Sequence, residues 1–79
     1  MRTTRYFEEQ VLRKRPYLRR HWIAAVLEVP LERVPQPDGR VRYWGYVAEL
    51  QRYLRVVTLS DGETVHNAFF DRGYGGPGR

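Results

Sequence analysis

The sequence predicts an α+β domain in which two N-terminal helices pack on one face of a three- to four-stranded antiparallel β-meander. Three observations indicate this fold class. Apolar residues recur at helical spacing in the first third of the chain, and a proline follows each helical pattern. The remaining residues alternate between apolar and polar types and are divided by turn residues. Helices followed by strands with short turns are typical of one helical layer on one sheet.

The first helix is expected to begin after Thr3 or Thr4 and to end before Pro16. Either threonine can cap it, because a side-chain oxygen can accept a hydrogen bond from a free backbone N–H of the first turn. Glu8 and Glu9 suit the positive end of the helix dipole. Pro16 ends the helix because its ring disfavours helical geometry in the residue before it.

The second helix is expected from about residue 18 to residue 29, where Pro30 stops it. Its apolar residues recur at the spacing of one buried helix face. They are Trp22, Ile23, Val26 and Leu27.

Four strands are expected after the helices, each bounded by turn residues, at 31–36, 41–47, 53–59 and 63–70. Pro35 makes the first of them an edge strand, because proline has no N–H to donate to a sheet. Pro-Asp-Gly at 37–39 and Ser-Asp-Gly at 60–62 are typical of tight turns. The predicted sheet is therefore a meander.

The alternating strands place two different sets of side chains on the two sheet faces. One set consists of Val41, Tyr43, Gly45 and Val47 along the strand at 41–47 and of Leu54, Val56 and Thr58 along the strand at 53–59; one of the two faces must meet the helices, and which one stays open. The other set consists of Arg42, Trp44, Tyr46, Tyr53, Arg55, Val57 and Leu59.

Domain organisation and compartment follow from composition. Residues 1–72 are expected to form a single domain, and residues 73–79 a flexible Gly-rich tail. The chain has no cysteine, which excludes disulfides and thiolate metal sites. It shows no signal peptide and no apolar run of roughly 20 residues, so we expect no membrane association and a cytoplasmic location.

The charge of the chain favours a polyanionic partner. The formal net charge is +5, and all but one of the 14 basic residues are arginine. Arginine pairs bidentately with phosphate and stacks on bases, which lysine does not. A GC-rich genome would also favour arginine codons, but an excess of positive charge raises the encounter rate with any polyanion.

The sheet face opposite the helices is the first candidate binding surface. Arg42 and Arg55 lie mid-strand there, with Tyr43, Trp44, Tyr46 and Tyr53 nearby. Arginine next to aromatic rings is how single-stranded nucleic acid is often held, with bases on the rings and phosphate on the guanidinium. The alternative is that the aromatics are half-buried strand formers and the arginines a solvated face.

His66 is the candidate acid–base residue, because an imidazole titrates near neutral pH. Arg72 and Tyr74 would act with it if the tail folds back. The alternative is a hydrogen-bonded strand histidine without a catalytic role. Arg19 and Arg20, before the second helix, form either a phosphate-contacting edge or a solvated one.

Motifs for other chemistries are absent from the sequence. It contains no P-loop, no dinucleotide fingerprint and no G-x-S-x-G nucleophile motif. The two histidines, His21 and His66, have no metal-ligand spacing. We therefore expect neither a cofactor nor a metal site.

One pattern of motifs spans about residues 4–72. A P-D-G-R turn is followed by R-Y-W-G-Y, then by L-R-V-V-T-L, and then by D-G-E-T-V-H-N-A-F. The order of helices, turn and strands resembles a small bacterial domain family of unknown function that is distantly similar to RelE/BrnT-type toxin ribonucleases. The clear first strand of the toxin fold is missing here or reduced to a few residues around 1–5.

The resemblance implies metal-independent cleavage of mRNA, with the ribose 2′-hydroxyl as the nucleophile. A base takes its proton, an acid protonates the leaving 5′-oxygen, and arginine stabilises the charged phosphorane. Mapped by position, His66 would be the acid or base, Tyr74 a second acid, and Arg42, Arg55 and Arg72 the phosphate ligands. The resemblance also implies an acidic antitoxin-like partner protein.

Three functions are consistent with the sequence. The first is RNA binding, with RelE-like endoribonuclease activity as its catalytic form. The second is a non-catalytic interaction module that binds an acidic partner through its sheet face or edge. The third is an enzyme acting on a small molecule, for which a deep apolar pocket around His66 would be evidence. The chain is expected to be a monomer or a homodimer.

Overall fold

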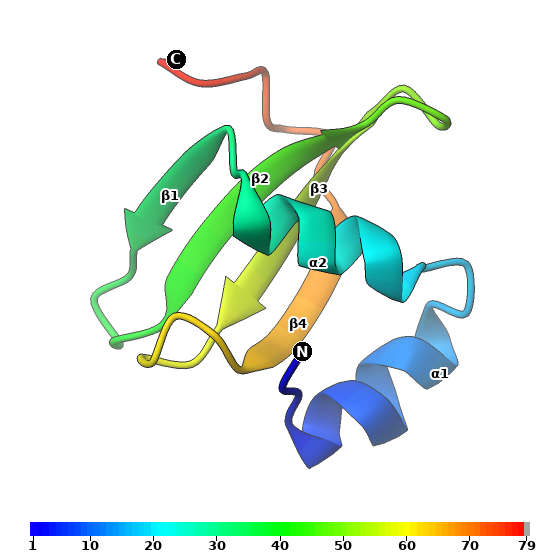
Figure 1. The fold of residues 1–79 in the computed structure, drawn as a ribbon, viewed down its shortest axis with the longest axis vertical. Coiled ribbons are helices and arrows are strands. Elements are labelled where there is room, and N and C mark those ends of the chain that lie inside the picture. Colours follow the sequence, from blue (N-terminus) through cyan, green and yellow to red (C-terminus); the bar gives the residue numbers. More distant parts are fainter. Residues whose placement is uncertain (79) are drawn as a thin grey trace.

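The computed structural model describes residues 1–78 and has an α+β fold, as predicted (Figure 1). The helical segments, in chain order, are the π-helix η1 (Phe7–Val11), α1 (Leu12–Lys14) and α2 (Arg20–Glu28). The strands are β1 (Glu32–Pro35), β2 (Val41–Val47), β3 (Arg52–Thr58) and β4 (Val65–Phe70). Each strand lies within about two residues of its predicted bounds.

The four strands form one antiparallel sheet in the order β1-β2-β3-β4, which is the predicted meander. β1 pairs with β2 and is an edge strand, with Pro35 opposite Val41. At the other edge, the N-terminal segment runs beside the start of β4. There the N–H of Thr4 donates to the carbonyl of Val65 at 2.9 Å, and the N–H of Val65 donates to the carbonyl of Arg2 at 2.9 Å.

Thr4 caps the first helical segment, because its Oγ1 accepts a hydrogen bond from the N–H of Phe7 at 3.1 Å. Of the two threonines predicted as caps, Thr4 therefore has this role. Thr3 instead donates its hydroxyl to Glu8 at 2.6 Å. The segment ends at Arg15, directly before Pro16, as proline geometry requires.

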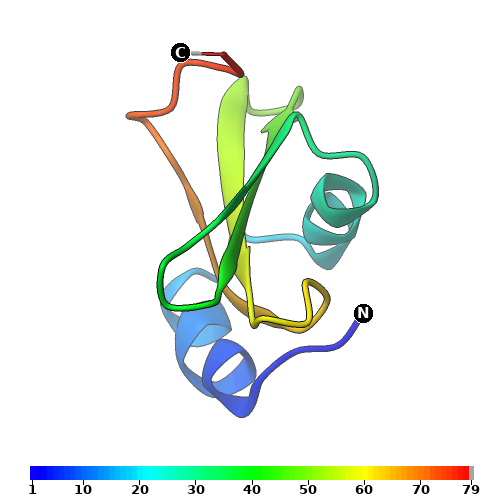
Figure 2. The same ribbon diagram turned by 90° about the vertical axis from the view of Figure 1, so that its left-hand side faces the viewer.

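Helix α2 lies in front of β2 and β3 in Figure 1, whereas η1 and α1 lie lower, beside β4; Figure 2 shows the same arrangement from the side. Side chains from both helical segments join the sheet in one buried apolar cluster. It consists of Phe7, Val11, Leu18, Ile23, Val26, Val41, Tyr43, Val47, Leu54, Val56, Val65 and Ala68. The core face of β2 and β3 is thus the one that carries Val41, Tyr43, Val47, Leu54 and Val56.

Gly45 lets α2 come close to the sheet. A Cβ at this position would lie 2.5 Å from Cγ2 of Val26, a distance that real Cβ atoms do not reach. The position therefore accepts glycine only, unless the helix moves away.

A β-bulge interrupts the pairing of β3 with β4. Val57 pairs with Asn67 and Thr58 pairs with Val65, so His66 has no partner residue across the strands. An extra residue in one strand breaks the simple alternation of faces. Val65 and Ala68 are fully buried, and the two residues between them, His66 and Asn67, are both half-buried.

Candidate functional site

A polar hollow of about 220 Å³ contains His66 and lies between Tyr6, directly before η1, the β1–β2 turn and the sheet face that carries Arg42, Trp44 and Arg55, which we call the outer face. Residues from four separate parts of the chain line it. They are Tyr6, Gln36, Arg40, Arg55, Val57, His66, Asn67 and Phe69. The bulge brings His66 and its neighbour Asn67 to the same hollow, although successive strand residues normally point to opposite faces.

His66 is held by two contacts from the N-terminal segment. Its Nδ1 shares a hydrogen bond of 3.0 Å with Oγ1 of Thr4, and its ring stacks on Tyr6 with centroids 4.8 Å apart. Burial lowers the pKa of His66 below the ordinary 6.5, and the nearby charge of Arg40 lowers it further. At neutral pH the imidazole is therefore mainly uncharged, and Nε2 makes no hydrogen bond to residues 1–78.

Arg55 crosses the centre of the outer face. Its guanidinium lies 5.6 Å from the ring centroid of Trp44 and 5.1 Å from that of Phe69. Nη1 is 3.7 Å from a carboxylate oxygen of Asp71, which forms an ion pair. These contacts fix the plane of the guanidinium.

On the outer face, the positive charge of the arginines exceeds the negative charge that neutralises it. Burial lowers the pKa of Arg55 first, and repulsion by the neighbouring Arg42 lowers it further. Among residues 1–78, the buried Nε atoms of Arg42 and Arg55 have no hydrogen-bond partner. A buried donor without a partner costs free energy, so an anion placed between these side chains would be stabilised.

Trp44 and Tyr74 form a stacked pair on the same face. Their rings are nearly parallel, at 9°, with centroids 4.8 Å apart. Tyr53 meets Tyr74 edge-on at 5.0 Å, and the Tyr74 hydroxyl donates a hydrogen bond of 2.7 Å to Glu32. Burial, followed by the hydrogen bond to Glu32, raises the pKa of Tyr74 to about 12.

The predicted catalytic residues divide into two groups. Arg55 and His66 line the same hollow, whereas Arg72 and Tyr74 line another hollow of about 220 Å³ with Tyr53 and residues near it. In this arrangement the Tyr74 proton points to Glu32 rather than to the His66 hollow. The flexibility predicted for residues 73–79 stays a prediction, and residue 79 lies outside the described residues; Tyr74 makes the contacts described above.

The other residues predicted to bind nucleic acid differ in how far their side chains are buried. Arg42 and Tyr53 are half-buried, Trp44 is buried, and Tyr46 is exposed with its ring against Tyr53. These side chains of β2 and β3 are thus neighbours on one sheet face, while Trp44 is covered by the ring of Tyr74.

Arg19 and Arg20 lie away from this face, at the start of α2. Arg20 donates a hydrogen bond of 2.9 Å from Nη1 to Glu8 and so links α2 to η1. This contact is the largest cause that lowers the pKa of Glu8, to about 2. Arg20 therefore has a structural role as a link between helices.

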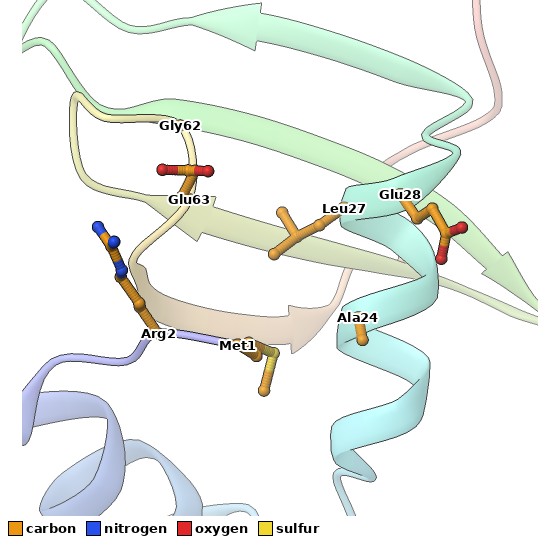
Figure 3. Close-up of a pocket in the computed structure, with 7 residues that line it drawn as sticks. All are labelled: Met1, Arg2, Ala24, Leu27, Glu28, Gly62 and Glu63. Atoms are coloured by element: carbon orange, nitrogen blue, oxygen red, sulfur yellow. The ribbon is translucent and has the colours of Figure 1, made fainter.

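Two larger cavities lie on the α2 side of the molecule. One, of about 510 Å³, is bounded by the N-terminus, α2 and the β3–β4 turn (Figure 3). Its lining includes Glu28 and Glu63 against one basic residue, Arg2, and so does not favour a polyanion. The other, of about 580 Å³, runs between α2 and the end of β2. Neither contains a residue predicted to be catalytic.

Six residues of the His66 hollow were not predicted as site residues: Tyr6, Gln36, Arg40, Val57, Asn67 and Phe69. The P-D-G-R turn was a usable signal for Arg40, because that turn ends in an arginine next to a strand of the basic face. The bulge at His66 does not change the alternation of apolar residues in the sequence. The sequence therefore could not predict that Asn67 lies at the same hollow as His66.

Comparison with models of protein families, with curated proteins and with solved structures finds no match for this chain. Within residues 1–78, no helix is long and apolar enough to cross a membrane. The same residues contain no group of three or more His, Cys, Asp or Glu side chains that could hold a metal ion.

Proposed function

We propose that this protein binds single-stranded RNA on the outer face of its sheet, with one phosphate in the His66 hollow. The observation that carries the proposal is the convergence of Arg40, Arg55 and His66 on one polar hollow. The charge of Arg55 supports it: this side chain lines the hollow and is repelled by the neighbouring Arg42, and a phosphate would neutralise that repulsion.

Exposed aromatic rings near the hollow support stacking of bases. One face of Tyr6 is covered by His66, and the residue is 49% exposed. Tyr46 is exposed at the far end of β2. Base–aromatic stacking tolerates any sequence, so these rings would bind RNA with little base preference.

The catalytic form of the proposal is a RelE-like, metal-independent endoribonuclease. Neutral His66 takes the proton of the ribose 2′-hydroxyl through Nε2. The 2′-oxygen then bonds to phosphorus as the bond to the 5′-oxygen breaks, which leaves a 2′,3′-cyclic phosphate and a 5′-hydroxyl. Arg40 and Arg55, which line the hollow, stabilise the added negative charge, and Tyr6, which also lines it, protonates the 5′-oxygen.

The relation to RelE-type toxins is part of the same proposal. Two helices, the continuous η1–α1 and α2, precede an antiparallel sheet, and the N-terminal residues pair in parallel with β4 at the bridge between Thr3 and Val65. That bridge is consistent with a first strand reduced to a few residues. The packing of both helices on one sheet face and an acidic antitoxin-like partner stay predictions of this relation.

Cleavage is tested with purified protein, a labelled single-stranded RNA and EDTA in the buffer. Cyclic-phosphate products from the wild type, absent with His66→Ala and present with His21→Ala, are the expected result. His21→Ala is the matched control because His21 is an exposed histidine on α2. Intact RNA with the wild type, or equal cleavage by both variants, would remove the catalytic form and leave RNA binding.

The second candidate function is a non-catalytic module that binds an acidic protein. The observation that favours it is the open edge of β1, which pairs with β2 only and carries the exposed Arg33. An extended acidic segment could add a strand there. Competition between RNA and a polyglutamate peptide separates the two functions: tighter binding of the peptide at equal charge would favour the protein partner.

A further inference from the structure

We propose that Trp44 carries a separate stacking site for one nucleobase, and that Tyr74 closes this site in the free protein. The inference rests on the RNA-binding function proposed above and adds a second contact to it. Trp44 is only 7% exposed, and the ring that lies parallel to its indole is that of Tyr74. A nucleobase is also a flat π system, so it fits the place that the Tyr74 ring occupies.

The residues around Tyr74 are suited to contact a nucleobase that takes the place of its ring. Tyr53 forms an edge-on wall, and Glu32 accepts the hydrogen bond that the Tyr74 hydroxyl donates. With Tyr74 displaced, the Glu32 carboxylate would accept an N–H from the edge of a base instead. The site therefore favours bases that present an N–H donor next to the stacked ring.

The segment that carries Tyr74 is suited to move. Glycines at 73, 75 and 76 flank the tyrosine and allow large changes in backbone dihedral angles. Asp71 lies at the base of the segment and is held by the Trp44 indole N–H at 3.0 Å and by Arg55. The N–H of Tyr74 also donates to the carbonyl of Asp71 at 3.3 Å and the N–H of Gly73 to its carboxylate at 3.1 Å, so the ring of Tyr74 leaves Trp44 by rotation of its side chain while Asp71 keeps its contacts.

Arg55 lies next to both parts of the proposed RNA site, the phosphate site in the His66 hollow and the base site on Trp44. Its guanidinium lies 5.6 Å from the Trp44 ring centroid, and the same side chain lines the His66 hollow. A phosphate in the hollow and a base on Trp44 would therefore both touch Arg55. One strand of RNA can supply both groups.

The test uses the full chain with Trp22→Phe, so that Trp44 is the single tryptophan and reports stacking by fluorescence quenching. The probes are 2′-O-methyl hexauridylate, which lacks the nucleophilic hydroxyl, and an abasic hexamer of the same charge. Tyr74→Ala should bind the hexauridylate roughly tenfold more tightly, with stronger quenching, because no ring has to be displaced. The affinity for the abasic hexamer should not change.

Tyr74→Phe provides a second variant that keeps the ring and loses the hydroxyl bond to Glu32. Tyr74→Phe should also bind hexauridylate more tightly than wild type, with a smaller gain than Tyr74→Ala. Circular dichroism checks that both variants fold. An unchanged or weaker affinity for hexauridylate in either folded variant, or an equal gain for the abasic hexamer, would overturn the inference. If the wild type binds neither probe, RNA binding itself fails; if it binds both and Tyr74→Ala gains nothing, only the Trp44 site fails.

Discussion

The imidazole of His66 stacks on the ring of Tyr6 with centroids 4.8 Å apart, which joins the N-terminal segment to β4 at one polar hollow. Thr4, which caps the first helical segment, also bonds to His66. The start of the helix, the last strand and the histidine are therefore coupled. A change in the cap is expected to affect the position of the imidazole as well as helix stability.

The pKa of His66 should respond to Arg40. Burial and then the charge of Arg40 keep this pKa below 6.5, so the histidine loses its base function only when the pH falls through the lowered value. Arg40→Gln should raise the pKa toward 6.5 and move the acid limb of any cleavage profile to higher pH. NMR titration of the imidazole Cε1–H measures this, with His21→Gln to assign the two signals. An unchanged pKa of His66 would show that the charge of Arg40 does not affect the imidazole.

Gly45→Ala should destabilise the fold. The added Cβ would lie 2.5 Å from Cγ2 of Val26, and overpacking of this kind costs about 1–3 kcal/mol. Chemical denaturation measures the loss. Gly73→Ala is the matched control, because its Cβ would find its nearest contact at 3.5 Å. Combining Gly45→Ala with Val26→Ala should cost less than the sum of the two single changes, whereas simple additivity would contradict the close approach of helix and sheet.

Glu8 should make stability depend on acid pH. Its hydrogen bonds from Arg20 and Thr3 lower its pKa from 4.5 to about 2, so the folded state favours the ionised carboxylate. The resulting stabilisation is complete above about pH 4.5 and is lost as the pH falls through about 2. Because the pair is more than a third exposed, it contributes about 0.2–1 kcal/mol.

Thermal unfolding at several pH values tests this role of Glu8. Glu8→Gln should lower Tm at pH 7 and leave it unchanged at a pH below about 2, where the wild-type carboxyl is also protonated. Glu9→Gln removes the same charge from a more exposed ion pair with Arg5 and should lower Tm less. An equal decrease of Tm in the two variants at pH 7 would show that the ion pair between Glu8 and Arg20 adds nothing to the stability of the fold.

Much of the fold could be predicted because its signals are local. Prolines at 16 and 30 mark the helix ends, and the alternation in β2 and β3 gives the correct two faces. The candidate site was predictable only in part. His66 and Arg55 lie together as a result of strand pairing, but the bulge, the stacking of Tyr6 and the position of Tyr74 over Trp44 depend on contacts distant in sequence.

The most direct test of the central claim is the salt dependence of the affinity for a 2′-O-methyl single-stranded RNA. Wild type is compared with Arg40→Gln and Arg55→Gln, and with Arg2→Gln, which removes the same charge beside the α2-side cavity. We predict that affinity falls steeply with salt. Each hollow variant should bind more weakly and lower the slope of log affinity against log salt by about 0.7, whereas Arg2→Gln should change neither. An affinity independent of salt, or equal losses in all three variants, would contradict an RNA site in the His66 hollow.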